Sequence, residues 1–479
     1  MNRYLLIAVV LITLVAVAVA VGRRSARRLV RTRRIRIDRF KLRRKHTEIQ
    51  MEVFSDKEVV AAIRHYAREH KVPIEEAHSQ AQTYLSEIVP KFNLLAYYKV
   101  GAPIARAILN FLYRVVVERN TLREFSDKAR GGVVVYVINH RSNADYVLVA
   151  HMLFRFVSLS YAIGEWARVW PLNHIFKWFG GYFVRRRYRE PLYHAILRAF
   201  VQTITRNGVT QGIFIEGGLT RDGAFLKPKL GMLDYLVTSK QDPAFTQPLY
   251  LVPTAINYDR TLEDRTLTEE LLGREDRSTR LEKFRTTLDF LFKNFFRSLL
   301  HRFKRYGYAV VSFAEPILID DAIRRNPLLL AETFEERKPA LQALADEVMR
   351  HISDALPLTP VPVVARVFSE GHGDGWLSEQ RIIEDIGRIQ EKQRERVWLT
   401  RERSADEIWR SARTLLELRH LIVQEGSTFR WNPQQALIRD YYANSLLSYD
   451  EVKARGWPQR ESSKGGISAV RHPSSPAPA

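Results

Sequence analysis

The sequence predicts an α/β protein whose mixed sheet is flanked by helices, and three observations support this fold class. Between Gly131 and Ile319, short runs rich in β-branched and aromatic residues alternate with helical stretches, the pattern of a layered α/β domain. The 479 residues can bury a sizeable core. A content of 46% hydrophobic and 27% charged residues is typical of globular proteins. The predicted strands are 133–138, 159–163, 182–184, 212–215, 249–256 and 308–313.

The N-terminal segment has the composition of a membrane anchor. Tyr4 to Gly22 is uncharged and almost wholly apolar over 19 residues, close to the ~20 needed to cross a bilayer. Only Arg3 precedes this stretch, whereas 13 Lys/Arg and one Asp follow it in residues 23–45. This length predicts a transmembrane helix within 1–22, in the cell inner membrane or cytoplasmic membrane, and the positive-inside rule places the rest of the chain on the cytoplasmic side. A cleaved signal peptide is the alternative, because Ala18 and Ala20 resemble a cleavage site.

The formal net charge of +22 indicates an anionic partner. The basic juxtamembrane segment 23–50 suits anionic headgroups, so membrane lipid is the expected partner. Nucleic-acid binding is the other reading of such a cluster, but no recognisable nucleic-acid module accompanies it. The chain contains no cysteine, which excludes a disulfide framework and a thiolate metal site and fits a reducing compartment.

Helical patterns flank the predicted α/β domain on both sides. Apolar residues from Ser55 to about Glu124 recur at mixed spacings of three and four, which predicts helices. Ala96 to Val117 within this region is interrupted by charges, so we expect an amphipathic helix on the core or at the membrane interface. The predicted units after the juxtamembrane segment are a helical region 51–125, the α/β domain 126–325, a mainly helical region 326–462 and a disordered tail 463–479 rich in Ser, Pro and Gly.

The most informative pattern is His140 followed five residues later by Asp145, directly after the predicted strand 133–138. On one continuous helix, residues five apart point about 140° away from each other. If Ser142 or Asn143 caps a new helix, His140 lies at the strand exit and Asp145 in the first helical turn, where the two can meet. Such a pair suits a histidine general base held by a carboxylate. A helix cap beside a surface histidine is the alternative.

The segment Gly180 to Arg186 is a short predicted strand that ends in two guanidinium groups, those of Arg185 and Arg186. Guanidinium forks match phosphate oxygens in geometry and charge, so this segment can hold a phosphorylated substrate. A solvated basic surface is the other interpretation.

A third segment, Ile213 to Arg221, is a predicted strand followed by glycines. Gly217 lets the backbone approach a ligand closely, and Arg221 adds another phosphate donor. We expect Glu216 to accept a hydrogen bond from a substrate hydroxyl or to pair with an arginine. A glycine-rich turn stabilised by an ion pair is the alternative.

A fourth segment, Leu251 to Tyr258, is an apolar strand with a proline near its start. Its composition suits either core packing or the lining of an acyl channel.

In this order, the four segments resemble the motifs of the glycerolipid acyltransferase family. The first is similar to that family's histidine and aspartate motif, the second to its glycine, aromatic and arginine motif, and the third to its glutamate and glycine motif. The resemblance covers roughly 55–447 and is specific only in the motifs. The segments that resemble the glycerol-3-phosphate acyltransferase branch within this family are Phe214 to Met232, Asn257 to Arg260 with Leu262 and Glu263, and Asp440 to Ser445.

The resemblance implies acyl transfer to the sn-1 hydroxyl of glycerol 3-phosphate, the first step of phospholipid synthesis. His140, held by Asp145, would remove the hydroxyl proton as that oxygen attacks an acyl thioester, either acyl-CoA or acyl carrier protein. No metal and no further cofactor is implied. The residues that the resemblance assigns to substrate binding are Arg185, Arg186, Glu216, Gly217 and Arg221.

Three other functions remain open at this point. The nearest is the same chemistry on lysophosphatidate or dihydroxyacetone phosphate. A catalytically inactive protein that tethers membranes or binds lipid would not need His140. A membrane-anchored nucleic-acid binder would depend on residues 23–45 and would bind duplexes in a salt-sensitive way.

Overall fold

The computed structural model describes residues 46–89, 102–117, 131–153, 160–163, 181–185, 188, 190–272, 306–370, 375–393 and 403–457. The predicted anchor 1–22, the basic cluster 23–45 and the predicted tail 463–479 lie outside these ranges. No helix within the described ranges is long and apolar enough to span a membrane.

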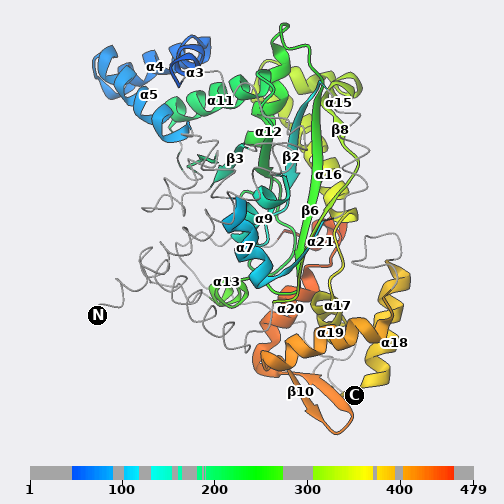
Figure 1. The fold of residues 1–479 in the computed structure, drawn as a ribbon. Coiled ribbons are helices and arrows are strands. Elements are labelled where there is room, and N and C mark those ends of the chain that lie inside the picture. Colours follow the sequence, from blue (N-terminus) through cyan, green and yellow to red (C-terminus); the bar gives the residue numbers. More distant parts are fainter. Residues whose placement is uncertain are drawn as a thin grey trace, which may run out of the picture.

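A mixed sheet of eight strands forms the centre of the described structure (Figure 1). Its order is β1-β7-β6-β2-β5-β3-β4, and β8 pairs with β6. Strands β6, β2, β5, β3 and β4 run parallel, whereas β7 is antiparallel to β6 and parallel to β1. The strand bounds are β1 (Arg114–Val117), β2 (Val133–Ile138), β3 (Ser160–Ile163), β4 (Gly181–Phe183), β5 (Gln211–Phe214), β6 (Leu249–Tyr258), β7 (Tyr308–Phe313) and β8 (Ile317–Leu318).

The central strand β2 shows why the sequence forms this sheet. It consists of three valines followed by Tyr-Val-Ile, and every side chain except that of Val134 is buried. A parallel strand covered on both faces is apolar throughout rather than alternating, because neither face meets water. Its side chains still alternate between two cores: Val135 and Val137 belong to one, and Tyr136 and Ile138 to the other.

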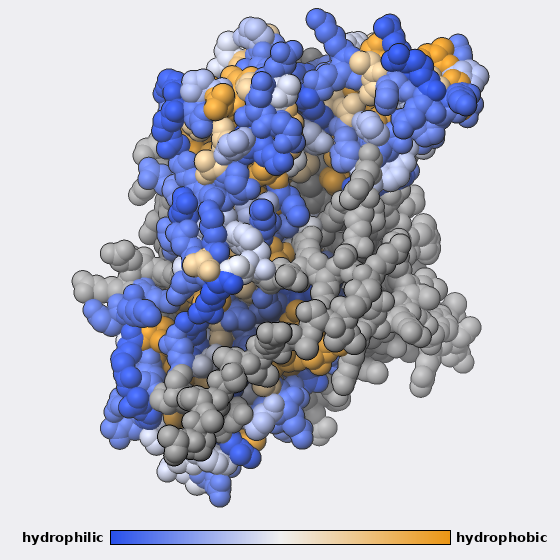
Figure 2. Space-filling model, turned by 180° about the vertical axis from the view of Figure 1, so that it is seen from behind, coloured by the Kyte–Doolittle hydropathy of each residue, from blue (hydrophilic) through white to orange (hydrophobic). Residues whose placement is uncertain are grey.

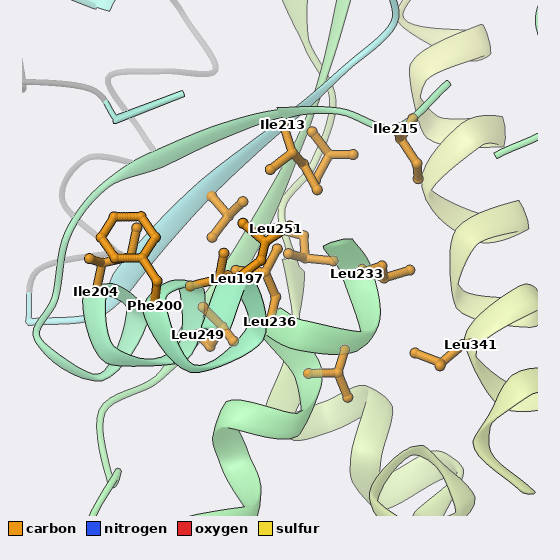
Figure 3. Packing of buried hydrophobic residues seen from close by; sticks show 14 of the residues in the cluster. Leu197, Phe200, Ile204, Ile213, Ile215, Leu233, Leu236, Leu249, Leu251 and Leu341 are labelled. Carbon is orange, nitrogen blue, oxygen red and sulfur yellow. The ribbon is translucent and has the colours of Figure 1, made fainter. Parts of the chain in front are cut away.

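Helices cover both faces of the sheet. The larger core lies against α11, α12 and α16, with α4 and α5 packed beyond α11. Figure 3 shows apolar side chains of α11 and α12 converging on those of β5 and β6. The second core lies against α7 and α9. The described helices from His46 to Asp354 are α3 (His46–Phe54), α4 (Lys57–His70), α5 (Ile74–Ile88), α7 (Ala102–Leu112), α9 (Ala144–Leu153), α11 (Pro191–Arg206), α12 (Leu230–Val237), α13 (Asp264–Leu271), α15 (Ile319–Arg325) and α16 (Phe334–Asp354).

The C-terminal region forms a separate apolar cluster below the sheet in Figure 1. Its helices are α17 (Pro360–Ser369), α18 (Glu379–Lys392), α19 (Ala405–Leu418) and α20 (Ala436–Asn444), whereas Tyr449 of α21 (Tyr449–Arg455) packs in the larger core. A small antiparallel sheet, which the sequence did not predict, joins β9 (Leu377–Ser378), β11 (Thr428–Trp431) and β10 (Ile422–Glu425). Seen from behind, hydrophilic residues cover most of the described surface and apolar residues appear in small groups (Figure 2).

The prediction of one amphipathic helix over 96–117 is wrong at its C-terminal end. Helix α7 ends at Leu112, and residues 114–117 form β1, which pairs with β7. Three consecutive valines follow Arg114, and β-branched side chains favour an extended strand over a helix.

Candidate functional site

Three residues predicted for the site lie at the carboxyl edge of the parallel strands. Ile138 of β2 pairs with Phe214 of β5, and the register continues through β3 to Phe183 of β4. His140 lies two residues after Ile138, Glu216 two residues after Phe214, and Arg185 two residues after Phe183. Ligands of open α/β sheets bind outside this edge. Three strand spacings separate β2 from β4, so the backbones of His140 and Arg185 lie about 14 Å apart.

The spacing of His140 and Asp145 gives the contact that the sequence predicted. Helix α9 begins at Ala144, so Asp145 lies in its first turn. Nδ1 of His140 lies 2.9 Å from Oδ2 of Asp145. Both side chains are buried, with exposed fractions of 1% and 0%. The alternative of a surface histidine is therefore wrong.

Four donors fix the orientation of the Asp145 carboxylate. Besides His140, Oδ2 accepts hydrogen bonds from the backbone N–H groups of Arg141 at 2.8 Å and Ser142 at 3.0 Å. Oδ1 accepts the hydroxyl of Tyr258 at 2.5 Å. Because the carboxylate only accepts, we assign the imidazole proton to Nδ1, which leaves Nε2 as the basic nitrogen.

Tyr258 is a residue that the sequence did not single out for this role. It ends β6, next to β2 in the sheet. Burial and the neighbouring Asp145 carboxylate raise the pKa of Tyr258 well above its usual value, so its hydroxyl keeps its proton and donates.

The start of α9 is held by Glu263, which follows β6 along the chain. Its carboxylate accepts the hydroxyl of Ser142 at 2.7 Å and the backbone N–H of Asn143 at 3.2 Å. Ser142 in turn accepts the N–H of Ala144 at 3.1 Å, so it acts as the predicted cap. Burial raises the pKa of Glu263 to about 7.

The described contacts of Glu216 are to backbone. Oε2 accepts the N–H of His140 at 2.6 Å and Oε1 accepts the N–H of Leu226 at 2.7 Å. Burial raises the pKa of Glu216 to about 7, although the charge of Arg141 opposes the shift. Glu216 thus ties the loop after β5 to the exit of β2. Its expected contact with a substrate hydroxyl stays a prediction.

Gly217 makes the turn that follows. Its φ is +65°, and a Cβ at this position would lie 2.9 Å from Cγ of Lys229. The position therefore favours glycine for both its backbone conformation and its close neighbour.

Arg185 and Arg221 are each held by a carboxylate from a helix. The guanidinium of Arg185 contacts Glu87 of α5 at 2.7 and 2.8 Å, through Nη2 to the two carboxylate oxygens. Arg221 pairs with Glu270 of α13 at 2.7 Å. A phosphate bound by either arginine would have to compete with these carboxylates. The remaining predicted phosphate ligand, Arg186, lies outside the described residues.

Arg141, which sequence reasoning missed, is a buried cation directly after His140. Its guanidinium donates to the carbonyl oxygen of Gly223 and, at 3.4 Å, to that of Ser445. It also lies 4.9 Å from the ring centroid of Phe225. The one sequence signal for this role was its place beside the predicted base.

Gly223 lies close against the C-terminal region, in the loop after β5. Its φ is +85°, and a Cβ there would overlap with the carbonyl oxygen of Tyr441. We expect Gly223→Ala to lower the free energy of unfolding by about 3 kcal/mol, since it combines a strained backbone with overpacking. Urea denaturation measures this loss.

Gly456→Ala is the matched control, because its φ is +83° and nothing lies within 4 Å of a Cβ there. Backbone strain alone should cost about 1 kcal/mol at this position. Equal losses in the two variants would contradict the close contact with Tyr441.

No group of His, Cys, Asp and Glu within the described ranges could hold a metal ion. The site offers a buried base, a carboxylate that orients it, and Arg185 at the same sheet edge, which suits proton removal from a hydroxyl.

Comparison with known proteins gives two family matches. A family model described as acyltransferase matches residues 115–257, and one described as the glycerol-3-phosphate acyltransferase C-terminal region matches residues 292–449. The solved structure of the 1-acyl-sn-glycerophosphate acyltransferase from Thermotoga maritima is 16% identical, with a TM-score of 0.31 over 60% of this chain and 93% of that one.

Curated relatives carry the name glycerol-3-phosphate acyltransferase. The protein from Actinobacillus pleuropneumoniae is 27% identical over 68% of this chain and 39% of its own length. That from Aeromonas hydrophila is 26% identical over 81% of this chain and 48% of its own length. The chain thus spans less than half the length of these relatives. The predicted resemblance is confirmed: residues 115–257 match the acyltransferase model, and residues 292–449 are similar to the C-terminal region of glycerol-3-phosphate acyltransferases.

Proposed function

We propose that this protein transfers an acyl chain from an acyl thioester to the sn-1 hydroxyl of glycerol 3-phosphate, the first step of phospholipid synthesis. The observation that carries the proposal is the buried contact between His140 and Asp145 at the ligand-binding edge of the sheet. The names of the matched relatives support glycerol 3-phosphate as the acceptor.

The chemistry follows from the assigned proton positions. Asp145 holds the Nδ1–H, so Nε2 of His140 takes the proton of the acceptor hydroxyl as its oxygen attacks the thioester carbon. A C–O bond forms, the C–S bond breaks, and the imidazolium returns its proton to the leaving thiolate. The step needs no covalent acyl-enzyme, and the chain has no cysteine that could form a thioester.

Arg185 and Arg221 are the described candidates for the substrate phosphate, and Arg186 is the third. A phosphate carries more charge than a carboxylate and offers more acceptor oxygens to a guanidinium fork, so a bound substrate phosphate would replace Glu87 or Glu270. Gly217 and Glu216 would line the same edge near the glycerol hydroxyls.

We propose acyl-CoA or acyl carrier protein as the donor, with no metal or further cofactor. The apolar segment 4–22 and the basic cluster 23–45 support a site at the cytoplasmic face of the inner or cytoplasmic membrane, beside membrane lipid.

The choice of acceptor tests the proposal. Purified full-length protein in detergent is given one acyl-CoA with glycerol 3-phosphate, lysophosphatidate or dihydroxyacetone phosphate, and thiol release is followed. We expect glycerol 3-phosphate to give the highest kcat/KM, by about tenfold or more, since a site that pairs both hydroxyls loses hydrogen bonds with the other acceptors.

A higher kcat/KM for lysophosphatidate would contradict the proposed acceptor. Thiol release that is unchanged in His140→Ala would contradict the proposed enzyme and favour a lipid-binding protein.

A further inference from the structure

Residues 258–264, which end β6 and enter α13, lie directly against the first turn of α9. We call them the positioning segment. Tyr258 at one end donates to Asp145, and Glu263 near the other end accepts from Ser142 and Asn143. Both contacts act on the turn that carries Asp145, so the placement of this carboxylate depends on the positioning segment.

The C-terminal region holds the positioning segment from its other side. Tyr442 of α20 donates its hydroxyl to Asp264 at 2.5 Å and accepts the backbone N–H of Thr261 at 3.3 Å. Arg419 forms an ion pair with Asp264 at 2.7 Å. All four residues are buried, and buried polar contacts of this kind specify one arrangement because broken ones are costly.

The same region also contacts the other two loops of the site. The carbonyl oxygen of Ser445 accepts from Arg141, beside the proposed base. Asn444 donates to the carbonyl oxygen of Asp222 at 3.1 Å, in the loop after β5. The segments after β2, β5 and β6 therefore all meet one surface, which α20 and the residues that follow it provide.

We propose that the C-terminal region is a working part of the acyl-transfer site, in which Tyr442 acts through the positioning segment and Tyr258 to keep Asp145 aligned with His140. Both tyrosines are positioning residues, because neither touches the reacting atoms in the proposed mechanism. The inference rests on the proposed function and gives the C-terminal region a role in it.

A third buried tyrosine provides a matched control. Tyr449 of α21 donates its hydroxyl to Asp346 of α16 at 2.7 Å. It follows α20 closely in the sequence, but Tyr449 and the helix of its partner both belong to the larger core rather than to the edge that carries His140. Each of the three tyrosines thus donates to one aspartate, and each Phe variant removes one oxygen while keeping the ring.

The experiment compares Tyr258→Phe, Tyr442→Phe and Tyr449→Phe in the full chain. Urea denaturation should show similar losses of stability in all three. We expect kcat to fall about tenfold in Tyr258→Phe, the rate equivalent of one hydrogen bond to a charged group. Tyr442 contacts Asp145 only indirectly, through the positioning segment, so we expect Tyr442→Phe to lower kcat by about threefold. Tyr449→Phe should keep the wild-type kcat.

The pH profile of kcat/KM separates positioning from general stability. Without the Tyr258 hydroxyl, the Asp145 carboxylate loses one donor, and its charge stabilises the protonated imidazole more strongly. The acid limb should therefore move to higher pH in Tyr258→Phe and stay in place in Tyr449→Phe. The titratable and charged groups around Asp145 are His140, Arg141, Glu216, Tyr258 and Glu263, with Tyr113 behind Tyr258.

Wild-type kcat in Tyr442→Phe would overturn the inference whatever the effect of Tyr258→Phe, and so would wild-type kcat with an unshifted acid limb in Tyr258→Phe. Equal losses of kcat in Tyr442→Phe and Tyr449→Phe would also overturn it, since they would reflect general destabilisation. The reference measurement is wild-type turnover with glycerol 3-phosphate that His140→Ala abolishes. Failure of that reference contradicts the proposed function, whereas a sound reference with unaffected tyrosine variants contradicts only the role of the C-terminal region.

Discussion

His140→Ala is expected to lower kcat by about 10²- to 10⁴-fold, the usual contribution of a general base. The variant loses Nε2, the atom to which we assign the proton transfer. It should stay folded, because the contact between residue 140 and Glu216 is made by the backbone N–H. Thiol release at saturating substrate measures the loss, and circular dichroism checks the fold.

His351→Ala serves as the control, because it removes an imidazole from the exposed side of α16. It should turn over at the wild-type rate. A folded His140→Ala protein with wild-type kcat would show that the imidazole has no part in the reaction.

Asp145→Asn is expected to lower kcat by about 100-fold, the upper range for a lost hydrogen bond to a charged group. Three N–H donors surround Oδ2, so the amide oxygen of asparagine should take this place and preserve the Nδ1–H tautomer. The amide nitrogen then faces the hydroxyl of Tyr258, which can accept. The fold and the geometry are kept, and the negative charge beside the imidazole is lost.

Asp145→Asn should also change the pH dependence of kcat/KM. Without the carboxylate charge, the protonated imidazole of His140 is less stable, so the acid limb of kcat/KM should move to lower pH in Asp145→Asn. Tyr258→Phe should move it in the opposite direction. A shift of both variants in the same direction would contradict the proposed chain of contacts.

Most strands of the large sheet could be predicted from the sequence because each is a short run rich in β-branched or aromatic residues. The predicted range 133–138 coincides with β2, and 308–313 coincides with β7. Strand β1 at the edge of the sheet was missed. The three valines of β1 look like the end of the preceding helical pattern until β7, almost 200 residues later, supplies their partner.

In the site, too, contacts between residues close in sequence could be predicted, whereas contacts between distant residues could not. The contact between His140 and Asp145 spans five residues, so a strand exit and a helix cap were enough to predict it. The contact of Asp145 with Tyr258 spans 113 residues, and that of Arg141 with Ser445 spans 304. Nothing local encodes such pairs, because they arise only when β6 and the C-terminal region pack against the sheet edge.

The arginines show a further limit of local patterns. Arg185 and Arg221 were predicted from their chemistry, but the helices α5 and α13 bring Glu87 and Glu270 to them. Carboxylates are common in both helical patterns, so the sequence offered no means of choosing the two that pair.

Identification of the product tests the central claim most directly. Purified full-length protein is incubated with acyl-CoA and glycerol 3-phosphate, and the acylated phosphate ester and the free thiol are quantified together by mass spectrometry. The proposed reaction predicts 1-acyl-glycerol 3-phosphate and thiol in equal amounts, with neither above background in His140→Ala. Thiol without the acylated ester, or equal product from both proteins, would contradict acyl transfer by the His140–Asp145 pair.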